Sequence, residues 1–293
     1  MITIVTPTYN RGYILPELFE SLKKQTCKDF KWMIIDDGSS DNTEEVVKGF
    51  LWEANFEIQY IKKSNGGKHT AVNVGVKEIS SELTFIVDSD DQLLPDAVET
   101  VIEKYSKYKE QENIGIYSFL RCYKNGTNIV EVPENEMISN HITCRIKGNI
   151  LGDMAEVFVT KVLKDYPFPE FAEERFLSED TIWIEIAKKY DSVYFNKAIY
   201  QCEYLEDGIT VNDKPAKFKS PIGSMFRGKQ LMYVKCGLKV NIKGAIIYNC
   251  YKREVKGEIP SIVKPSTLME KVLVFVTKPL GYVYNLKWKK SIS

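Results

Sequence analysis

LTFIVDSDDQLLPDAVETVIEKY, residues 83–105, is the stretch that decides the fold. An apolar run that suits a buried strand leads directly into Asp88, Asp90 and Asp91, and Pro95 then opens an amphipathic helical pattern. Ionised carboxylates this close together repel one another, which is tolerable when they point into water. The cluster becomes favourable when a divalent cation, or a phosphate that carries one, lies among the carboxylates.

The same order of strand and helix precedes this stretch. Apolar runs predict strands, and helical spacing predicts helices between them, at residues 2–7, 14–22, 30–37, 39–51, 56–61 and 69–79 in turn. This alternation predicts an α/β fold with a mostly parallel sheet flanked by helices. Ligands of such sheets lie at the carboxyl ends of the strands, so Asp36, Asp37 and the later acids should converge on one edge.

The second half of the chain has a weaker pattern. A strand at 114–123, a loosely patterned polar region to Gly148, a helix at 178–190 and one or two strands at 191–205 are expected. From Lys214 onward, candidate helices at 224–236 and 244–255 precede an apolar and aromatic stretch at 270–290. We therefore expect residues 214–293 to form a basic, mainly helical C-terminal extension.

Charge divides the chain at the same place. The 293 residues carry no net charge, but residues 214–293 hold 17 basic and three acidic side chains, a net charge of +14, and residues 1–213 have a net charge of −14. A basic segment suits nucleic acid or an anionic membrane surface, although many are only solvated faces. This segment lacks a recognisable helix-turn-helix, so no nucleic-acid partner is expected.

Location and redox state are predicted from what the sequence lacks. No stretch approaches the roughly 18 apolar residues of a membrane span, and the start MITIVTPTYN has no signal-peptide pattern. We therefore expect a cytoplasmic protein with reduced cysteines. The six cysteines form no CxxC pair and only two histidines are present, so neither a disulfide framework nor a zinc site is indicated.

The segment NGGKHT, residues 65–70, resembles a phosphate-binding loop only in part. It lacks the further glycine and the Ser or Thr that this motif requires, and no GxGxxG follows the first strand. Gly66 and Gly67 could still bring backbone close to a ligand beside the charge of Lys68, or they could form a simple turn before a helix.

Two acidic pairs follow predicted strands. In IIDDGSSDNT, a carboxylate of Asp36 or Asp37 could accept a hydrogen bond from the N–H of a uracil-like base, but an Asx turn with a helix cap explains the segment as well. In DSDD, Asp88 and Asp90 are expected on one face of an extended chain, where both could reach one Mg²⁺ or Mn²⁺ held by a diphosphate.

Glu179 and Asp180 open the predicted helix that contains Trp183. Acidic residues are favourable at a helix N-terminus for electrostatic reasons alone. Alternatively, a carboxylate held at the start of a rigid element could act as a general base that removes a hydroxyl proton.

Taken in order, these motifs resemble those of the family 2 glycosyltransferases with the GT-A fold, especially bacterial enzymes of capsular and exopolysaccharide assembly. The resemblance covers roughly residues 1–210 and rests on TPTYNR, IIDDGSSDNT, GGKHTAVNVG, FIVDSDDQLLPDAVE and LSED. It implies a catalytic domain at 1–213, with a nucleotide-sugar-binding half at 1–112 and an acceptor-binding half at 113–213.

The resemblance also implies roles for individual residues. The implied nucleotide-binding residues are Thr6, Pro7, Tyr9, Arg11, Asp37, Lys68, Asn73, Asp88 and Ser89. Asp88 and Asp90 would hold Mn²⁺ or Mg²⁺ with the donor diphosphate, and Asp180 would be the catalytic base. Acceptor contacts would come from Asp153, Glu156 and Glu179. Many members carry an arginine two residues before the helix asparagine, where this chain has Ala71.

The implied activity is transfer of a sugar from a nucleoside-diphosphate-sugar, above all a UDP-sugar, to a hydroxyl of a saccharide or lipid-linked saccharide. The reaction would invert the configuration at the anomeric carbon of the sugar. The metal ion would stabilise the departing nucleoside diphosphate. Two alternatives stay open: a sugar-phosphate nucleotidyltransferase, and a non-catalytic scaffold subunit of a polysaccharide assembly complex.

The basic extension carries a separate prediction. Four aromatic residues are interleaved with four lysines along it, namely Phe275, Tyr282, Tyr284 and Trp288 with Lys278, Lys287, Lys289 and Lys290. This combination suits anionic headgroups, so we expect peripheral docking on the inner face of the cell membrane. The alternative is that these helices pack on the catalytic domain and their lysines balance its acidic surface.

Overall fold

The computed structural model describes residues 1–150, 152–202 and 213–291. The chain forms two compact units, and each gathers segments that are distant in sequence. The first unit consists of Met1–His141, Ile150–Pro167 and Lys189–Glu203. The second consists of Ile142–Asn149, Phe168–Lys188 and Tyr204–Ser293.

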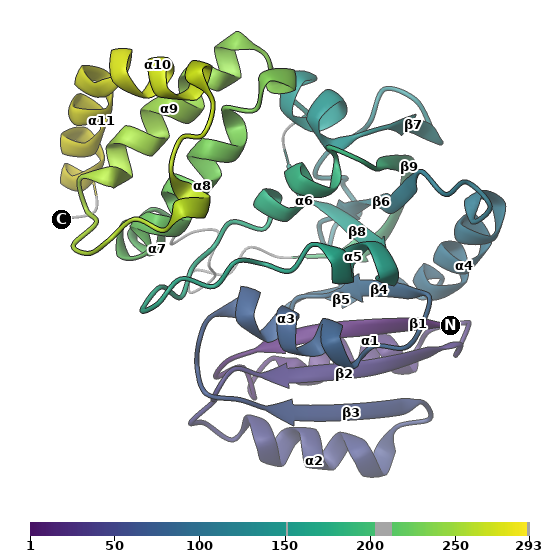
Figure 1. Ribbon diagram of the computed structural model, residues 1–293. Coiled ribbons are helices and arrows are strands. Elements are labelled where there is room, and N and C mark those ends of the chain that lie inside the picture. Colours follow the sequence, from purple (N-terminus) through teal and green to yellow (C-terminus); the bar gives the residue numbers. More distant parts are fainter. Residues whose placement is uncertain (151, 203–212, 292–293) are drawn as a thin grey trace. The chain divides into compact units, whose positions relative to one another are not determined.

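The first unit is built on one mixed sheet (Figure 1). Its strands follow the spatial order β3 (Glu57–Lys62), β2 (Phe30–Asp36), β1 (Ile2–Thr8), β4 (Leu83–Ile86), β8 (Met154–Val159), β6 (Ile114–Cys122), β9 (Asp191–Gln201) and β5 (Gln92–Leu93). The pairs among β3, β2, β1 and β4 are parallel, as is β6 with β9, whereas β8 runs antiparallel to β4 and β6. The predicted α/β fold is confirmed.

Alternate side chains of the central strands face different helices. Three helices pack on β1 and β2, namely α1 (Leu15–Lys23), α2 (Thr43–Glu53) and α3 (Lys68–Glu78). Ile4 and Trp32 belong to the core that includes the apolar stripes of α1 and α2. Val5 and Ile35 meet α3 at Gly75, where an added Cβ would lie 3.1–3.2 Å from their side chains. The period of two along a strand therefore explains why both faces are apolar and covered.

Three strands of this sheet were not predicted. β8 has the sequence MAEVFV, in which Glu156 interrupts the apolar run, and it is held between β4 and β6. β5 has two residues, and β7 (Met137–Ser139) pairs with β9 in the region expected to be irregular, just before a π-helix (Ile142–Lys147). Pairing with distant strands, rather than local pattern, fixes these elements. The helix after DSDD, α4 (Ala97–Tyr108), formed as predicted, and α5 (Thr160–Asp165) follows β8.

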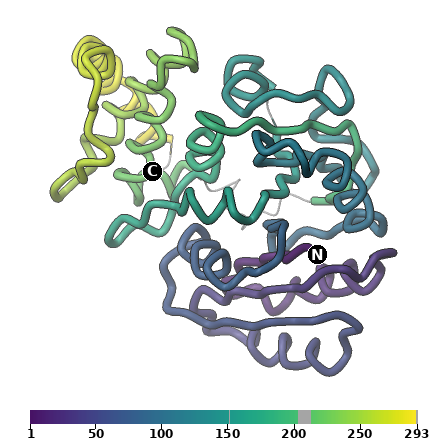
Figure 2. The backbone as a smooth tube through the Cα atoms, turned by 45° about the vertical axis from the view of Figure 1, so that its right-hand side comes forward, coloured from purple at the N-terminus to yellow at the C-terminus, as the bar shows by residue number. Residues whose placement is uncertain are grey.

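The second unit is mainly helical, and Figure 2 follows its last helices from green to yellow. Its helices are α6 (Asp180–Ile186), α7 (Asp213–Lys219), α8 (Pro221–Leu231), α9 (Leu238–Lys252), α10 (Leu268–Val276) and α11 (Lys278–Lys290). α8, α10 and α11 all pack against α9. The predicted helix at 178–190 ends at Ile186, and the mainly helical C-terminal part is confirmed. The domain boundaries at 112/113 and 213/214 stay predictions.

Helices α8 and α9 approach backbone to backbone. A Cβ added at Gly244 would lie 2.6 Å from the carbonyl oxygen of Gly228, and one added at Gly228 would lie 2.8 Å from that of Gly244. No side-chain rotation relieves such an overlap, because the opposing atoms are backbone.

Gly244→Ala is expected to lower the free energy of unfolding of the second unit by about 1–3 kcal/mol, the usual cost of overpacking. Gly257→Ala is the matched control in the same unit, because nothing lies within 4 Å of its added Cβ. That change should be neutral or stabilise by up to about 1 kcal/mol. Urea denaturation compares the two variants, and equal destabilisation would contradict the close packing of α8 on α9.

Candidate active site

The carboxyl ends of β1, β2 and β4 meet at one edge of the sheet. β2 pairs with β1 as far as Asp36 opposite Thr8, and β4 pairs with β1 as far as Ile86 opposite Val5. Parallel strands end at the same edge, so the acids that follow β2 and β4 are brought together there. The predicted convergence of IIDDG and DSDD is confirmed.

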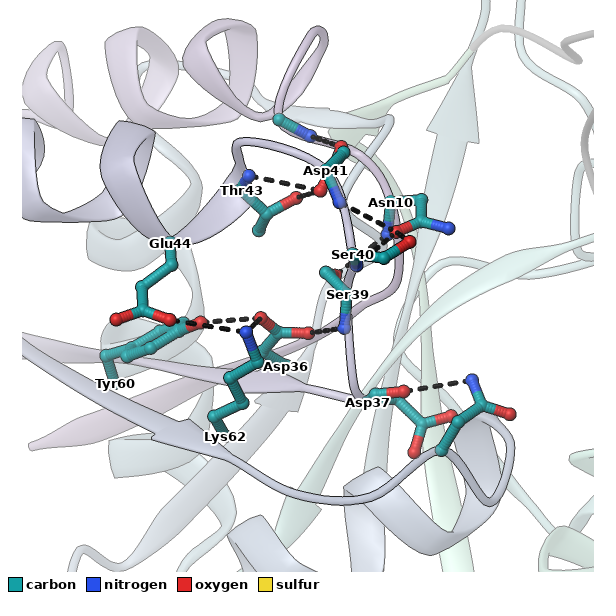
Figure 3. A network of polar contacts seen from close by, with 12 residues as sticks. Asn10, Asp36, Asp37, Ser39, Ser40, Asp41, Thr43, Glu44, Tyr60 and Lys62 are labelled. Atoms are coloured by element: carbon teal, nitrogen blue, oxygen red, sulfur yellow. Dashed lines mark hydrogen bonds and ion pairs between the residues drawn. The ribbon is translucent and has the colours of Figure 1, made fainter.

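Asp36 stabilises the turn after β2 (Figure 3). Its buried carboxylate accepts hydrogen bonds from the backbone N–H of Ser39 at 2.7 Å and from the hydroxyl of Tyr60 at 2.5 Å. Burial and the bond to Asp36 raise the pKa of Tyr60, so its hydroxyl stays protonated. The side chain of Asn10 accepts from the backbone N–H of Ser40 at 2.8 Å and thereby ties the loop after β1 to the loop after β2.

Asp37 organises the NGGKHT loop. Its Oδ1 accepts from Lys63 Nζ at 2.6 Å and from the backbone N–H of Gly66 at 2.9 Å, while Oδ2 accepts from the N–H of Gly67 at 2.7 Å. Gly67 has φ of 97°, a conformation that glycine adopts without strain. Three donors occupy three of about four acceptor positions of a carboxylate, so Asp37 can accept one more.

Two buried oxygen atoms beside Asp37 have no hydrogen-bond partner within the described part of the chain: Thr8 Oγ1 and Asn65 Oδ1. Asn65 Nδ2 donates to the carbonyl oxygen of Asp37 at 2.9 Å, and the N–H of Asp37 donates to the carbonyl oxygen of Thr8 at 2.8 Å. A buried polar atom left unpaired costs about 1–3 kcal/mol, so these atoms suit a ligand that supplies donors. Neither residue was identified from the sequence. The available signals were that Thr8 ends a strand and that Asn65 precedes two glycines.

Asp88 and Asp90 stand on a turn. β4 ends at Ile86, and the N–H of Asp91 donates to the carbonyl oxygen of Asp88 at 3.2 Å. The prediction that an extended chain presents both carboxylates on one face is therefore wrong, because the chain reverses where the strand stops. The carboxylates remain electrostatically close, since the charge of Asp88 contributes to raising the pKa of Asp90.

Two cations flank Asp88. Lys68, at the start of α3, forms an ion pair with Asp88 Oδ1, and Arg121 Nη1 of β6 lies 3.7 Å from Oδ2. Burial disfavours the charged form of Asp88, but Lys68 and Arg121 outweigh burial, and the pKa of Asp88 lies below its usual range. The carboxylate is thus held ionised.

Arg121, Tyr200 and Asp91 contact one another next to the turn. The guanidinium of Arg121 lies 4.1 Å from the centre of the Tyr200 ring and 3.6 Å from Asp91 Oδ2. The Tyr200 hydroxyl donates to Asp91 at 2.8 Å and accepts from the N–H of Asp88 at 2.9 Å. Burial, and then the charge of Asp88, raise the pKa of Asp91 to about 7. Sequence reasoning did not identify Arg121, although a single arginine within the apolar run IGIYSFLRC was a detectable signal.

Asp90 faces Arg11, whose Nη2 lies 3.9 Å from Asp90 Oδ2. Burial and then the charge of Asp88 raise the pKa of Asp90, while Arg11 opposes this rise. The described residues contain no group of three or more His, Cys, Asp or Glu side chains arranged as a metal centre. Two carboxylates nevertheless fit a hard cation such as Mg²⁺, which takes one or two carboxylates together with substrate phosphates and water.

The other residues predicted to bind nucleotide lie on β1 and just beyond it, on α3, and on the turn after β4. Thr6 and Pro7 belong to β1, and Thr6 Oγ1 accepts from the indole N–H of Trp32 at 2.9 Å. Tyr9 is exposed just beyond the strand. Asn73 is buried on α3, and Ser89 is buried on the turn.

The predicted acceptor residues divide between the units. Asp153 precedes β8 and Glu156 lies on it, in the first unit, where the charge of Glu156 contributes to raising the pKa of Arg121. Glu179 and Asp180 belong to the second unit, at the start of α6.

Arg227 of α8 forms an ion pair with Asp180 and donates to it through two nitrogens. Its Nε and Nη2 donate to Asp180 Oδ2 at 2.9 and 2.7 Å, and the hydroxyl of Ser178 donates to Oδ1 at 2.6 Å. The negative charge of Asp180 raises the pKa of Arg227. Such a forked pair fixes the orientation of the carboxylate, which a lysine in place of Arg227 would not do. Sequence reasoning missed Arg227, because it lies 47 positions along the chain.

Comparison with known proteins identifies the family. The profile described as "Glycosyl transferase family 2" matches residues 3–153, more than half of the chain. The chain belongs to glycosyl transferase family 2. The chain is 25% identical over 237 residues to a GalNAc(5)-diNAcBac-PP-undecaprenol beta-1,3-glucosyltransferase of Campylobacter jejuni, covering 78% of this chain and 74% of that enzyme. It spans only 16% and 39% of the length of two further curated relatives.

Solved structures show the same fold. S. aureus TarS 1-349 in complex with UDP-GlcNAc aligns with a TM-score of 0.60 and 18% identity, covering 98% of this chain and 92% of that one. Mannosyltransferase PcManGT from Pyrobaculum calidifontis in complex with GDP-Man and Mn²⁺ aligns with a TM-score of 0.55 and 16% identity, covering 96% and 73%. The predicted GT-A fold is confirmed.

The forked pair of Asp180 and Arg227 should show strong energetic coupling. In a double-mutant cycle with Asp180→Asn and Arg227→Gln, we expect a coupling free energy of about 1–3 kcal/mol, because either single change leaves a half-buried charge without its partner. The control is the exposed pair Lys264 and Glu258 of the same unit, 3.7 Å apart. Its coupling should stay below about 0.5 kcal/mol. Urea denaturation supplies the free energies, and a near-zero value for the first pair would contradict its assigned geometry.

Proposed function

We propose that this glycosyltransferase moves a sugar from a UDP-sugar to a hydroxyl of a saccharide or lipid-linked saccharide in polysaccharide biosynthesis, such as that of a capsule or exopolysaccharide. The reaction depends on a divalent cation and inverts the configuration at the anomeric carbon of the sugar, so an α-linked donor gives a β-linked product. One observation carries this proposal: the carboxylates of Asp88 and Asp90 lie beside the cations Lys68 and Arg11 at the edge where β1, β2 and β4 end.

The loops after β1 and β2 would hold the nucleoside. Asp37 has room for one more donor, and Asn65 Oδ1 and Thr8 Oγ1 are buried acceptors beside it. A uracil ring supplies an N–H donor and ribose supplies hydroxyl donors, so a uridine nucleotide would satisfy all three. Tyr9 would border the ring from its exposed position. The solved relative with bound UDP-GlcNAc supports a uridine nucleotide as the first choice.

Asp88 and Asp90 would hold Mn²⁺ or Mg²⁺ between them and the donor diphosphate. Once bound, the cation would stabilise the negative charge that develops on the leaving nucleoside diphosphate. Lys68 and Arg11 would then contact phosphate oxygens, since both already lie next to the two carboxylates. The solved relative with GDP-Man and Mn²⁺ supports a divalent cation.

Asp180 would remove the proton of the attacking acceptor hydroxyl. Arg227 and Ser178 fix its carboxylate, so the base would need no reorientation when the acceptor arrives. Glu179, Asp153 and Glu156 would contact the acceptor.

A lipid-linked acceptor would place the enzyme at the inner face of the cell membrane. The Campylobacter relative is named for an undecaprenol-linked substrate, and the basic C-terminal extension of this chain suits an anionic surface. In the described part of the chain, no helix has the length and apolar character needed to span a membrane.

The proposal is tested by incubating the purified protein with a panel of nucleotide sugars, with and without Mn²⁺, and measuring release of nucleoside diphosphate. Release from a UDP-sugar that requires the metal would support it. A protein that binds the donor but never releases nucleoside diphosphate with any acceptor would instead be a scaffold. The nucleotidyltransferase alternative is not retained, because the family is one of glycosyltransferases.

Asp90→Asn should lower metal-dependent turnover by about 10²-fold or more, the scale of losing a group that stabilises the transition-state charge. The fold should persist, because Asp90 lies on a turn rather than in the core. Product formation is measured across a Mn²⁺ titration beside thermal unfolding. Asp29→Asn, at an exposed carboxylate of the same unit, is the control. Normal turnover in Asp90→Asn would remove Asp90 from the metal site.

Asp180→Asn should lower transfer by roughly 10²–10⁴-fold, the usual loss when a positioned general base is removed. Donor affinity should be nearly unchanged, since the base acts on the acceptor. Isothermal titration with UDP and single-turnover transfer separate the two effects, and Glu185→Gln on the same helix is the control. A collapse of donor affinity would make Asp180 a binding residue instead.

A further inference from the structure

Helices α10 and α11, drawn in yellow tones in Figures 1 and 2, carry exposed apolar side chains. Phe275, for example, keeps 70% of its surface exposed. The exposed apolar side chains on the two helices are Leu268, Val272, Phe275, Val276, Leu280, Tyr282, Val283, Tyr284 and Leu286. On α10 the first four recur at helical spacing and form one continuous face. A contiguous exposed apolar face on helices commonly marks an interaction site.

The most buried residues of α11 are small or polar, namely Gly281 and Asn285. Gly281 lies against Asn249 of α9, because an added Cβ would stand 2.4 Å from the Asn249 Cβ. Asn285 is buried and donates to the carbonyl oxygen of Cys250 at 2.9 Å. An ordinary surface helix buries its apolar side, whereas α11 leaves Leu280, Val283 and Leu286 exposed. Packing on α9 therefore does not explain these aliphatic residues of α11.

The corner between the two helices is fixed by hydrogen bonds. Asn249 Nδ2 donates to the carbonyl oxygen of Val274 at 2.7 Å and to the hydroxyl of Thr277 at 3.0 Å. Thr267 and Glu270 form a capping box at the start of α10. The apolar face is thus presented on a defined scaffold.

The same two helices are positively charged. Between residues 268 and 290 the chain has five lysines and one acid, Glu270. Glu270 is buried, where its carboxylate accepts from the N–H of Ser266 at 2.7 Å. The lysines are exposed, namely Lys271, Lys278, Lys287, Lys289 and Lys290.

The structure changes which residues form this surface. Trp288 packs against the rings of Tyr251 and Tyr284, at 6.1 and 5.6 Å. Lys289 is paired with Glu254 at 2.8 Å. The membrane contacts of Trp288 and Lys289 stay a prediction, and the exposed apolar surface is centred on aliphatic residues and Phe275.

We propose that this face, which we call the α10–α11 face, inserts its apolar side chains at the interface of an anionic lipid bilayer while its lysines contact the headgroups. The two helices expose aliphatic side chains and five lysines, and their own single acid, Glu270, is buried. This combination complements a surface that is negative outside and apolar beneath. The inference rests on the proposed function for its purpose, since a lipid-linked acceptor lies at such a surface. Its test does not require activity.

The experiment is sedimentation of the full chain with vesicles of phosphatidylcholine, alone or mixed with phosphatidylglycerol, at low and high salt. We expect binding to the anionic vesicles only, weakened by salt. Val272→Ser with Phe275→Ser, and separately Lys271→Gln with Lys278→Gln and Lys287→Gln, should each lower the partition coefficient by about tenfold or more. Trp52→Ser is the control, because Trp52 on α2 is 93% exposed and lies in the other unit.

Thermal unfolding checks that the variants are folded, and the changed side chains are exposed, so little effect is expected. Equal sedimentation of the parent and both sets of variants overturns the proposal. Vesicle-independent dimerisation that Val272→Ser with Phe275→Ser abolishes also overturns it, in favour of a second copy of the chain. Donor turnover with a water-soluble acceptor is measured on the same samples: loss of vesicle binding with turnover retained separates this inference from the proposed function.

Discussion

The charge balance around Asp88 is the constraint on which the candidate site depends. Its partly buried surroundings would favour a neutral acid, yet Lys68 and Arg121 keep it ionised. These cations come from a helix and a strand that are distant in sequence, and they reach Asp88 because β6 lies across β8 from β4. Tyr200 joins the same network through the N–H of Asp88 and the carboxylate of Asp91. The acidic turn is therefore part of a neutralised assembly and not an isolated surface cluster.

A second role of carboxylates in this protein is to shape loops. Asp36 and Asp37 adjoin in sequence but act differently: Asp36 closes its own turn, whereas Asp37 folds the glycine loop around itself. Strong acceptors at the end of a strand satisfy backbone N–H groups that no ladder reaches. The rigid loops that result leave Thr8 and Asn65 with buried oxygens at the edge where a nucleotide would lie.

The helical unit has specific polar contacts in its interior, and its helices α10 and α11 expose apolar residues. Gly228 and Gly244 allow α8 and α9 to touch, and Asn249 and Asn285 join α10 and α11 to α9. Hydrogen bonds between buried partners specify geometry more sharply than apolar contacts do. The same unit contains Asp180 and the arginine that orients it, so the proposed base and the α10–α11 face share one scaffold.

The sequence by itself determined the parallel strands β1 to β4, the helices between them and the convergence of two acidic segments, because period and strand order are local properties of the chain. It also determined the family, through motifs in a fixed order. Only the tertiary structure decided that Asp88 and Asp90 share a turn and that β8 lies antiparallel in the sheet. It also decided that Arg121 is a charge partner of Asp88 and that Arg227 is the charge partner of Asp180. It likewise decided that Trp288 is packed while Phe275 is exposed. These features depend on which distant residues meet, and burial and ion pairing are properties of such meetings rather than of any local pattern.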